Sequence, residues 1–369
     1  MAEALFGDVY RGRRVLVTGH TGFKGSWLTL WLKELGAEVF GYALPPATQP
    51  NHWEALGLSM TDEMGDIRDG AALRAFVTRV HPEIVFHLAA QPIVRLSYRE
   101  PVATFATNVI GSLNVYEACR AAETVRAIVS ITTDKVYENR EWAWGYRECD
   151  RLGGHDPYSA SKACADLATT SYQRSYWPVE RYGQEHQTLL CVARAGNVVG
   201  GGDWAEDRLV PDLMRGVAAR TQAVLRNPQS VRPWEHVLDP LSGYLLLGQR
   251  LWEGRAEFAR PWNFGPSSDG VMTVEDVVRA MRDAWPVIDY RVEVPPDAPH
   301  EAGLLTLDCS LARSRLGWHP LWDGVTCFAR TAQWYRARAE RGEVVSLPQL
   351  RDYVEAARRS KATWVNAHD

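Results

Sequence analysis

The most constraining feature of the sequence is a regular alternation of short apolar runs with longer amphipathic stretches. The runs 13–19 (RRVLVTG), 38–44 (EVFGYAL), 83–90 (EIVFHLAA) and 126–137 (RAIVSITTDKVY) are separated by stretches with helical spacing, such as 25–37 and 102–122. Strands that are apolar on both faces are typical of a parallel sheet covered by helices on each side. The sequence therefore predicts an α/β fold whose first half is a doubly wound parallel sheet.

Composition and charge disfavour several other classes of protein. The chain has 369 residues, of which 46% are apolar, and 41 lysines and arginines stand against 45 aspartates and glutamates, with no basic block typical of a nucleic-acid surface. No apolar run is long enough to span a membrane, and the first strand begins too early for a signal peptide to precede it. The six cysteines form no CxxC pair or Cys/His cluster, so neither a disulfide framework nor a zinc site is indicated, and we expect a cytoplasmic protein.

A glycine-rich turn follows the first predicted strand. VLVTGHTGFKGSWL places Gly19, Gly22 and Gly25 at three-residue intervals between a strand and a helix. Backbone amides of such a turn can approach a pyrophosphate at the helix N-terminus, where larger side chains would hold the phosphates off. The alternative is a tight turn without a ligand. A phosphate loop of the ATPase kind is disfavoured, because Lys24 is followed by glycine and not by a hydroxyl residue.

The next two predicted strands concern the choice of dinucleotide. The second strand, 38–44, lacks the acidic residue expected about twenty positions after the turn to hold the ribose of NAD, and no arginine stands there for NADP. The third strand is followed by Asp66, whose carboxylate could hydrogen-bond the adenine amine or, alternatively, cap a helix. These residues predict a dinucleotide and leave NAD against NADP open.

Tyr158 and Lys162, in DPYSASKACAD, are four residues apart, and Pro157 suits the first turn of a helix, so the two side chains share one face. A phenol has a pKa near ~10, and lowering it to ~7 requires about 4 kcal/mol, which an adjacent ammonium and a nicotinamide cation could supply. Tyr158 would then remove a hydroxyl proton while hydride leaves for the cofactor. The spacing is common by chance, and its combination with the glycine turn favours the catalytic interpretation.

With these motifs the chain resembles the extended short-chain dehydrogenase/reductases, whose sheet is of the Rossmann type. The resemblance rests on TGHTGFKG (18–25), HLAAQ (87–91), TTDKVY (132–137) and YSASK (158–162) and covers about residues 10–340. More narrowly the chain resembles the NAD-dependent sugar-nucleotide 4,6-dehydratases, and a lysine at the third position of the TDK triplet is the pattern of those acting on CDP-glucose. The resemblance implies a hydro-lyase that converts CDP-glucose to CDP-4-keto-6-deoxyglucose for deoxysugar biosynthesis.

This reaction would use the triplet Thr133, Asp134 and Lys135. Oxidation at C4 of the hexose makes a ketone that acidifies the C5 hydrogen, water then leaves across C5 and C6, and the hydride returns to C6. The resemblance implies that Thr133 hydrogen-bonds the 4-hydroxyl and that protonated Asp134 donates to the departing hydroxyl. Lys135 would assist C5 deprotonation, either as the base, which needs a pKa well below ~10.4, or by tuning a neighbour. The alternative is that Asp134 and Lys135 only cap or pair at a strand end.

The resemblance also implies which residues hold the ligands. For the cofactor these are Gly19, Thr21, Gly22, Phe23, Lys24, Gly25, Asp66, Ile67, Leu88, Ala89, Ala90, Thr132, Tyr158 and Lys162. For the nucleotide sugar, Arg232 matches a position where a guanidinium grips the diphosphate bidentately, and Asn197 matches one that contacts the sugar nucleotide. Gln91, Arg208 and His236 are further candidates.

The expected organisation follows from these assignments. We expect residues 1–193, with a later return segment near 234–265, to form the dinucleotide-binding Rossmann domain. Residues 194–233 and 266–345 are expected to form a smaller C-terminal α/β substrate-binding lobe, and 346–369 a polar, loosely held tail. The apolar faces of 102–122 and 159–177 resemble the dimer helices of the family, which implies a homodimer or a larger homo-oligomer. The alternative is that either face packs against the sheet of its own chain.

Two rival functions remain open at this point. A nucleotide-sugar 4-epimerase, or a dehydratase of another nucleotide sugar, would share the fold, although an epimerase would not need Asp134 and Lys135. A dinucleotide-sensing binding protein without catalytic activity would not need the complete set of threonine, tyrosine and lysine.

Overall fold

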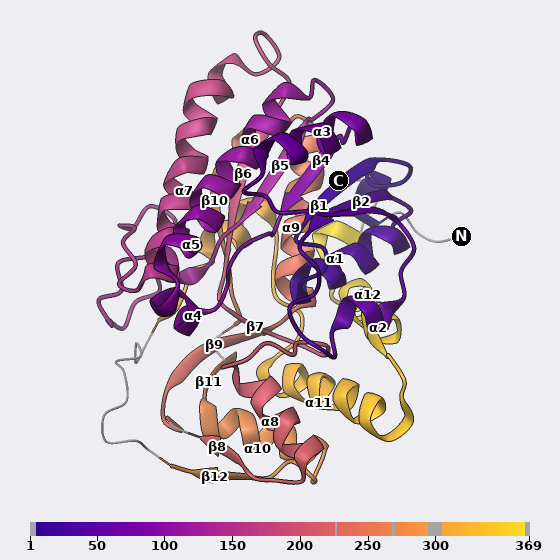
Figure 1. Cartoon of the computed structure of the whole chain (residues 1–369), viewed down its shortest axis with the longest axis vertical. Helices are drawn as coiled ribbons and strands as arrows, with labels where there is room; N and C mark the ends of the chain where they lie inside the picture. Colours follow the sequence, from indigo (N-terminus) through magenta and orange to yellow (C-terminus); the bar gives the residue numbers. More distant parts are fainter. Residues whose placement is uncertain (1–4, 226, 268–269, 294–304, 366–369) are drawn as a thin grey trace.

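The structure, a computed structural model, describes residues 5–225, 227–267, 270–293 and 305–365. Its largest element is a seven-stranded sheet with the order β10-β6-β5-β4-β1-β2-β3 (Figure 1). Every pairing between neighbouring strands of this sheet is parallel. The strands are β1 (Arg14–Thr18), β2 (Glu38–Ala43), β3 (Thr61–Met64), β4 (Ile84–His87), β5 (Ala127–Ile131), β6 (Leu189–Ala195) and β10 (Pro261–Phe264).

Helices cover both faces of this sheet (Figure 1). One face carries α3 (Gly70–Val80), α6 (Gly111–Ala121) and α7 (Pro157–Tyr176), and the other carries α1 (Phe23–Glu34), α9 (Leu238–Trp252) and α12 (Ser346–Ser360). The shorter helices α2 (His52–Leu56), α4 (Val94–Arg99) and α5 (Pro101–Phe105) connect these elements, and a π-helical segment, Ala106–Ile110, leads into α6.

Two separate core clusters fill the space between the sheet and its two helical layers. Leu16 and Phe76 belong to the cluster on the α3 and α6 side, whereas Val15 and Trp27 belong to the cluster on the α1 and α9 side. Neighbouring residues of β1 therefore point to opposite faces, and both faces are buried. The predicted doubly wound sheet is confirmed.

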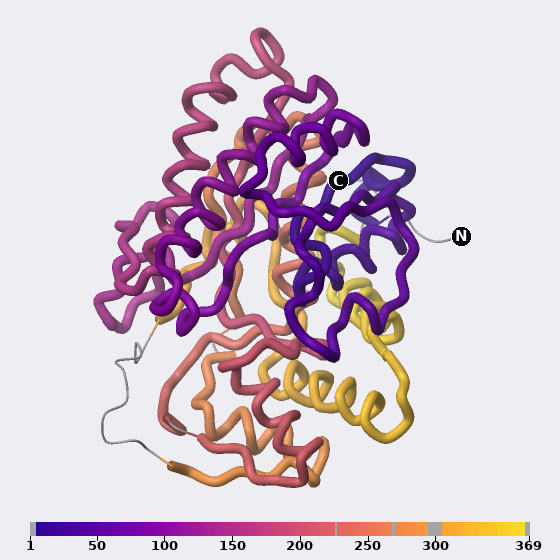
Figure 2. Tube along the Cα trace, in the orientation of Figure 1, coloured from indigo at the N-terminus to yellow at the C-terminus, as the bar shows by residue number. Residues whose placement is uncertain are grey.

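The other strands form two small sheets in the lower part of Figure 1, with the orders β11-β9-β7 and β12-β8. Helix α11 packs against α10 and β9. As Figure 2 shows, the chain passes from the main sheet into this lower lobe and back more than once. The elements are β7 (Asn197–Val199), β8 (Ala223–Leu225), β9 (Val231–His236), β11 (Val271–Thr273), β12 (Tyr290–Val292), α8 (Leu209–Ala219), α10 (Val274–Ala284) and α11 (Gly324–Arg341).

Two strands of the expected return segment belong to different sheets. Strand β10 pairs with β6, which places it at the edge of the main sheet, whereas β9, at the start of the segment, belongs to a small sheet. The boundaries of the two expected domains stay a prediction.

The expectation of a loosely held tail is wrong for its described part. Helix α12 buries Leu350, Tyr353 and Ala357, and the Tyr353 hydroxyl donates to Asp239 Oδ1 at 2.8 Å. Beyond the helix, Trp364 stacks on Phe6 with 4.9 Å between ring centroids. The polar composition conceals an apolar stripe with helical spacing, which packs on the main domain. Residues 366–369 lie outside the described residues.

Candidate active site

The glycine turn between β1 and α1 is packed against itself and against the chain after β4. Gly19 has a φ of +78°, in the left-handed region that favours glycine, and a Cβ on it would lie 2.7 Å from the Ala89 nitrogen. A Cβ on Gly25 would lie only 2.0 Å from the Gly19 oxygen. Gly22 is the N-cap of α1 and offers no side chain to its first amides. The start of this helix is therefore a place where backbone amides can receive an anion.

The alternative in which Asp66 caps a helix does not match the structure. Asp69, and not Asp66, is the N-cap of α3. Asp66 accepts hydrogen bonds from the backbone and the guanidinium of Arg68, which lowers the pKa of its carboxyl. Ile67 is buried and lies under Gly111, where a Cβ would meet it at 2.6 Å. The expected contact between Asp66 and adenine stays a prediction.

The triplet at the end of β5 forms one hydrogen-bonded unit. Thr133 Oγ1 donates to Asp134 Oδ1 at 2.8 Å and also caps the short helical turn Asp134–Val136. Lys135 Nζ donates to Asp134 Oδ1 and to Asn197 Oδ1, both at 3.0 Å. The ion pair of Asp134 and Lys135 that the sequence left as an alternative is thus present, whereas the cap is made by Thr133. They also bring together three expected catalytic residues and one expected substrate residue, Asn197.

Helix α7 brings the tyrosine and lysine to the same edge of the sheet. Pro157 is its first residue, as predicted, and Asp156 is its N-cap. The Tyr158 side chain hydrogen-bonds Thr133, while Lys162 Nζ donates to the Ile131 carbonyl at 3.0 Å. Because both side chains are more than nine-tenths buried, their ionisation depends strongly on neighbouring charges.

Burial acts against ionisation in both residues. It raises the pKa of Tyr158 to about 12, although the hydrogen bond between Tyr158 and Thr133 opposes this shift. The pKa of Lys162 falls to about 8 through burial and through the charge of Lys24, while Asp166 raises it. The groups of the chain alone therefore leave the phenol protonated at neutral pH, so its activation needs additional positive charge beside it.

The remaining candidates for substrate binding differ in how close they lie to the catalytic residues and in which groups they contact. Gln91 lies near the site with its amide directed to Thr104 and its backbone nitrogen bonded to Asn108. Arg208 pairs with Asp203 at 2.9 Å, and its charge also acts on Tyr158. Arg232, on β9, is half-buried and donates to the Val231 carbonyl.

His236 is placed in the core and not in the site. It has no exposed surface and lies between Trp27 and Trp322, with ring centroids 6.2 and 4.6 Å away. Burial lowers its pKa to about 3, so the ring is neutral. A side chain in this position cannot touch a substrate without rearrangement, and the structure therefore contradicts the expected substrate contact.

Sequence reasoning missed two buried residues at the edge of the site. Asn108, in the π-helical segment, donates to Ser161 Oγ at 2.8 Å and to the Gln91 carbonyl, and so connects the chain after β4 to α7. Glu235, on β9, is 1% exposed, and the charges of Lys24 and Asp134 act on it. Neither residue has a plain sequence signal, because a π-helical segment leaves none and Glu235 stands close to Arg232 and His236 in a polar stretch.

The fold and the arrangement of glycine turn, threonine, tyrosine and lysine define an extended short-chain dehydrogenase/reductase. Within this class, the chain belongs to the GDP-mannose 4,6 dehydratase family, whose model matches residues 16–327. The resemblance inferred from the sequence motifs is therefore confirmed.

Individual relatives agree with this assignment. A CDP-glucose 4,6-dehydratase from Salmonella typhimurium is 47% identical over 356 residues, which cover 95% of this chain and 99% of that protein. A dTDP-glucose 4,6-dehydratase from Xanthomonas campestris is 26% identical, covering 87% of this chain and 92% of its own. The crystal structure of dTDP-glucose 4,6-dehydratase from Streptomyces venezuelae, with NAD and TYD bound, has a TM-score of 0.74 at 24% identity and covers 89% and 98% of the two chains.

Proposed function

We propose that this protein is an NAD-dependent dehydratase that converts CDP-D-glucose to CDP-4-keto-6-deoxy-D-glucose. The observation that carries the proposal is the hydrogen-bonded unit of Thr133, Asp134 and Lys135 beside Tyr158. Hydride transfer needs Thr133, Tyr158 and Lys162. Asp134 and Lys135 therefore call for a second chemical step. The choice of CDP-glucose is supported by the 47% identity to the Salmonella enzyme of that name.

The cofactor assignment is supported by the fit of the glycine turn. Side chains at Gly19 and Gly25 would collide with backbone atoms, so the turn stays narrow, and the uncapped start of α1 offers amides to a diphosphate. Lys162 and Tyr158 lie at the same sheet edge, where a nicotinamide would stand. Bound NAD would supply the hydride acceptor for C4 and later the hydride donor for C6. Its cationic ring would also supply the positive charge that Tyr158 needs to ionise.

The residues of the chain divide the proton transfers between them. Tyr158 takes the proton of the 4-hydroxyl while Thr133 holds that oxygen. Once the ketone has formed, neutral Lys135 takes the C5 proton and returns it to C5 when the hydride reaches C6. The proton gained by Tyr158 returns to Asp134 through Thr133, which bonds to both residues. Asp134 then gives its proton to the C6 hydroxyl, which departs as water. Before the ketone forms, Lys135 donates hydrogen bonds to Asp134 and Asn197, and these contacts also align Asp134 with the C6 hydroxyl.

The test is mass spectrometry of the products formed from CDP-glucose, dTDP-glucose, GDP-mannose and UDP-glucose, each with NAD added. We expect loss of one water from the CDP sugar alone, without net formation of NADH. An unchanged mass with an inverted C4 centre would instead identify an epimerase. A binding protein would change none of the four compounds.

Two variants separate the chemical steps. With Tyr158→Phe, substrate should produce no NADH absorbance, because C4 oxidation is blocked. With Asp134→Asn, enzyme-bound NADH should accumulate, because oxidation proceeds while the departure of water is slowed. Full dehydration by Asp134→Asn would contradict the assigned role of the aspartate.

We also propose a homodimer formed through α5, α6 and α7. These elements and the adjoining segments expose apolar side chains, among them Val102 (81%), Ile110 (52%) and Leu167 (57%). Two copies could bury them in a four-helix bundle. Light scattering should give a dimer mass for the wild type and a monomer mass for Leu167→Asp.

For its location we propose the cytoplasm. All six cysteines are free, which suits a reducing compartment. Across the described residues, no helix combines the length and the apolar character that crossing a membrane requires. Fractionation of cells that express the tagged chain would test this proposal.

A further inference from the structure

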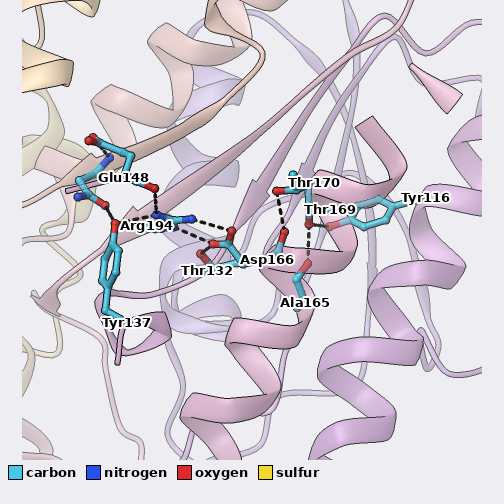
Figure 3. Close-up of polar contacts among 10 residues, drawn as sticks. Tyr116, Thr132, Tyr137, Glu148, Ala165, Asp166, Thr169, Thr170 and Arg194 are labelled. Carbon is cyan, nitrogen blue, oxygen red and sulfur yellow. Dashed lines mark hydrogen bonds and ion pairs between the residues drawn. The ribbon is translucent and has the colours of Figure 1, made fainter. Parts of the chain in front are cut away.

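A buried ion pair lies directly behind the catalytic residues. Arg194, on β6, and Asp166, on α7, are 2% and 0% exposed in their side chains. The guanidinium binds the carboxylate bidentately, with Nε–Oδ2 and Nη2–Oδ1 distances of 2.8 Å (Figure 3). Such a pair forms a rigid and directional link between two elements, because both hydrogen bonds fix the planes of the two groups.

Asp166 connects this pair to the chain before the triplet. Thr132 Oγ1, which directly precedes Thr133, donates to Asp166 Oδ2 at 3.1 Å (Figure 3). Lys162 is one helical turn before Asp166 on α7 and donates to the Ile131 carbonyl. The end of β5 is therefore tied to α7 at two successive turns, so the position of Tyr158 relative to Thr133 depends on both ties.

Arg194 also reaches the chain after the triplet. Its Nη1 donates to the Tyr137 hydroxyl at 2.7 Å and to the Glu148 carbonyl at 3.1 Å (Figure 3). The Tyr137 hydroxyl donates in turn to Asn263 Oδ1 at 2.7 Å, and the Asn263 backbone nitrogen donates to Glu148 Oε1 at 2.9 Å. One guanidinium thus bonds to α7, to the residue that follows the catalytic turn and to the loop beyond it.

We propose that Arg194 is a positioning residue that, through Asp166 and Tyr137, aligns α7 with both ends of the segment Thr132–Tyr137. The proposal rests on the proposed function for its activity test. Arg194 is buried and its hydrogen bonds point to protein groups, so it acts through Tyr158, Lys162 and the triplet and not by contact with substrate. A misplacement of about 1 Å between reacting groups can cost on the order of 100-fold in rate, which gives this alignment a measurable consequence.

The principal variant replaces both partners, Arg194→Met with Asp166→Leu. Removing both charges leaves no unpaired buried ion, so the fold is retained. Thr132 loses its bond to Asp166, and Tyr137 loses its bond to Arg194 while keeping the one to Asn263. We expect kcat to fall about 10- to 100-fold while KM for the nucleotide sugar stays within about threefold. Arg194→Lys keeps the charge but not the planar fork, and should show the same split between kcat and KM to a smaller degree.

The matched control is Tyr116→Phe. Tyr116 also joins β5 to α7, through Ser130 Oγ at 2.7 Å and Thr169 Oγ1 at 2.6 Å. Its contact with Thr169 (Figure 3) lies at the next turn of α7 beyond Asp166, farther from Tyr158. Its loss should lower the melting temperature by about 2–4 °C and leave kcat unchanged. A role of Arg194 in stability alone would make the two sites behave alike.

Hydrogen exchange provides a readout that needs no substrate. The amides of residues 132–137 should exchange faster in the double variant than in the wild type or in Tyr116→Phe. This result is independent of which nucleotide sugar the enzyme uses, and kcat is measured with whichever sugar the wild type converts. Wild-type kcat together with unchanged exchange in the double variant would overturn the proposal.

Discussion

The cofactor side and the substrate side of the site are built in different ways. The cofactor side, here the turn Gly19–Gly25 with Leu88–Ala90, depends on backbone atoms that approach within van der Waals distance. The substrate side, here Asn197, Arg208 and Arg232 with their partners, depends on side chains that meet across the fold, as Lys135 and Asn197 do over 62 residues of sequence. The cofactor side therefore tolerates almost no added atom. The substrate side tolerates changes in side-chain shape, but it loses activity when a charge or a hydrogen bond is removed.

The strongest test of this difference is Gly25→Ala. Its Cβ would lie 2.0 Å from the Gly19 oxygen, so the backbone of the turn must move. We expect a loss of about 3 kcal/mol or more in the free energy of unfolding and no retained NAD, measured by denaturant titration and by the absorbance of bound cofactor.

Gly22→Ala is the matched control for that variant. Its Cβ would lie 3.3 Å from the same oxygen and its φ is not in the left-handed region, so the fold should be kept. Cofactor affinity should still fall, because the added methyl stands at the start of α1. If Gly25→Ala proved as stable as Gly22→Ala, the close packing of the turn would not be what excludes side chains.

Tyr158→Phe should have the next largest effect. The change removes the proton acceptor for the 4-hydroxyl and adds no atom, so kcat should fall about 10³-fold while NAD binding and the melting temperature stay close to wild type. Steady-state kinetics and calorimetry check both parts. Retention of a tenth of the activity would mean that another group accepts the proton.

Sequence predicted the parts of the site that depend on short segments. TGHTGFKG, TTDKVY and YSASK each combine a local conformation with the residues that act there, so their placement follows from the strand or helix beside them. Lys135 and Asn197 were both named as candidates, but their contact requires the strand order, which no short segment contains.

The failures concern burial, which depends on distant partners. His236 stands in a charged, loop-like sequence but packs between two tryptophans, one from α1 and one from the segment before α11. The polar segment 346–360 hides a narrow apolar stripe that finds a surface on the main domain. Glu235 stands in the same charged stretch as His236 and is 1% exposed. None of these surfaces can be inferred from the residues that occupy them.

Glu235→Gln tests whether the substrate side contains a group that is neutral at physiological pH. Burial raises the pKa of Glu235 to about 8, the charge of Asp239 adds to the shift, and Lys24 opposes it. A carboxyl whose folded pKa lies above its unfolded value favours folding at low pH, and this contribution is lost as pH rises through about 8. The wild type should therefore lose stability relative to Glu235→Gln between about pH 5 and pH 8, by on the order of 3 kcal/mol.

Denaturant titrations of both proteins at several pH values would measure this difference. Asp239→Asn serves as a comparison, because burial also raises the pKa of Asp239, to about 7, and its contribution should be lost at slightly lower pH. Parallel stability curves for wild type and Glu235→Gln would show that Glu235 is ionised in the folded protein and paired with Lys24.

The smallest expected effect distinguishes two arginines of the substrate side. Arg232→Lys keeps a positive charge on β9 but removes the planar fork that suits a diphosphate, so KM for CDP-glucose should rise about 10- to 30-fold with kcat nearly unchanged.

Arg208→Lys should lower kcat and leave KM nearly unchanged. The charge of Arg208 lowers the pKa of Tyr158, and a shorter, more mobile ammonium would lower it less, so kcat should fall about threefold at neutral pH with little change in KM. Initial-rate kinetics on both variants decide between these roles. If Arg232→Lys lowered kcat and left KM unchanged, the guanidinium on β9 would act on the reacting groups and not on the diphosphate, and the substrate would have to enter the site in a different orientation.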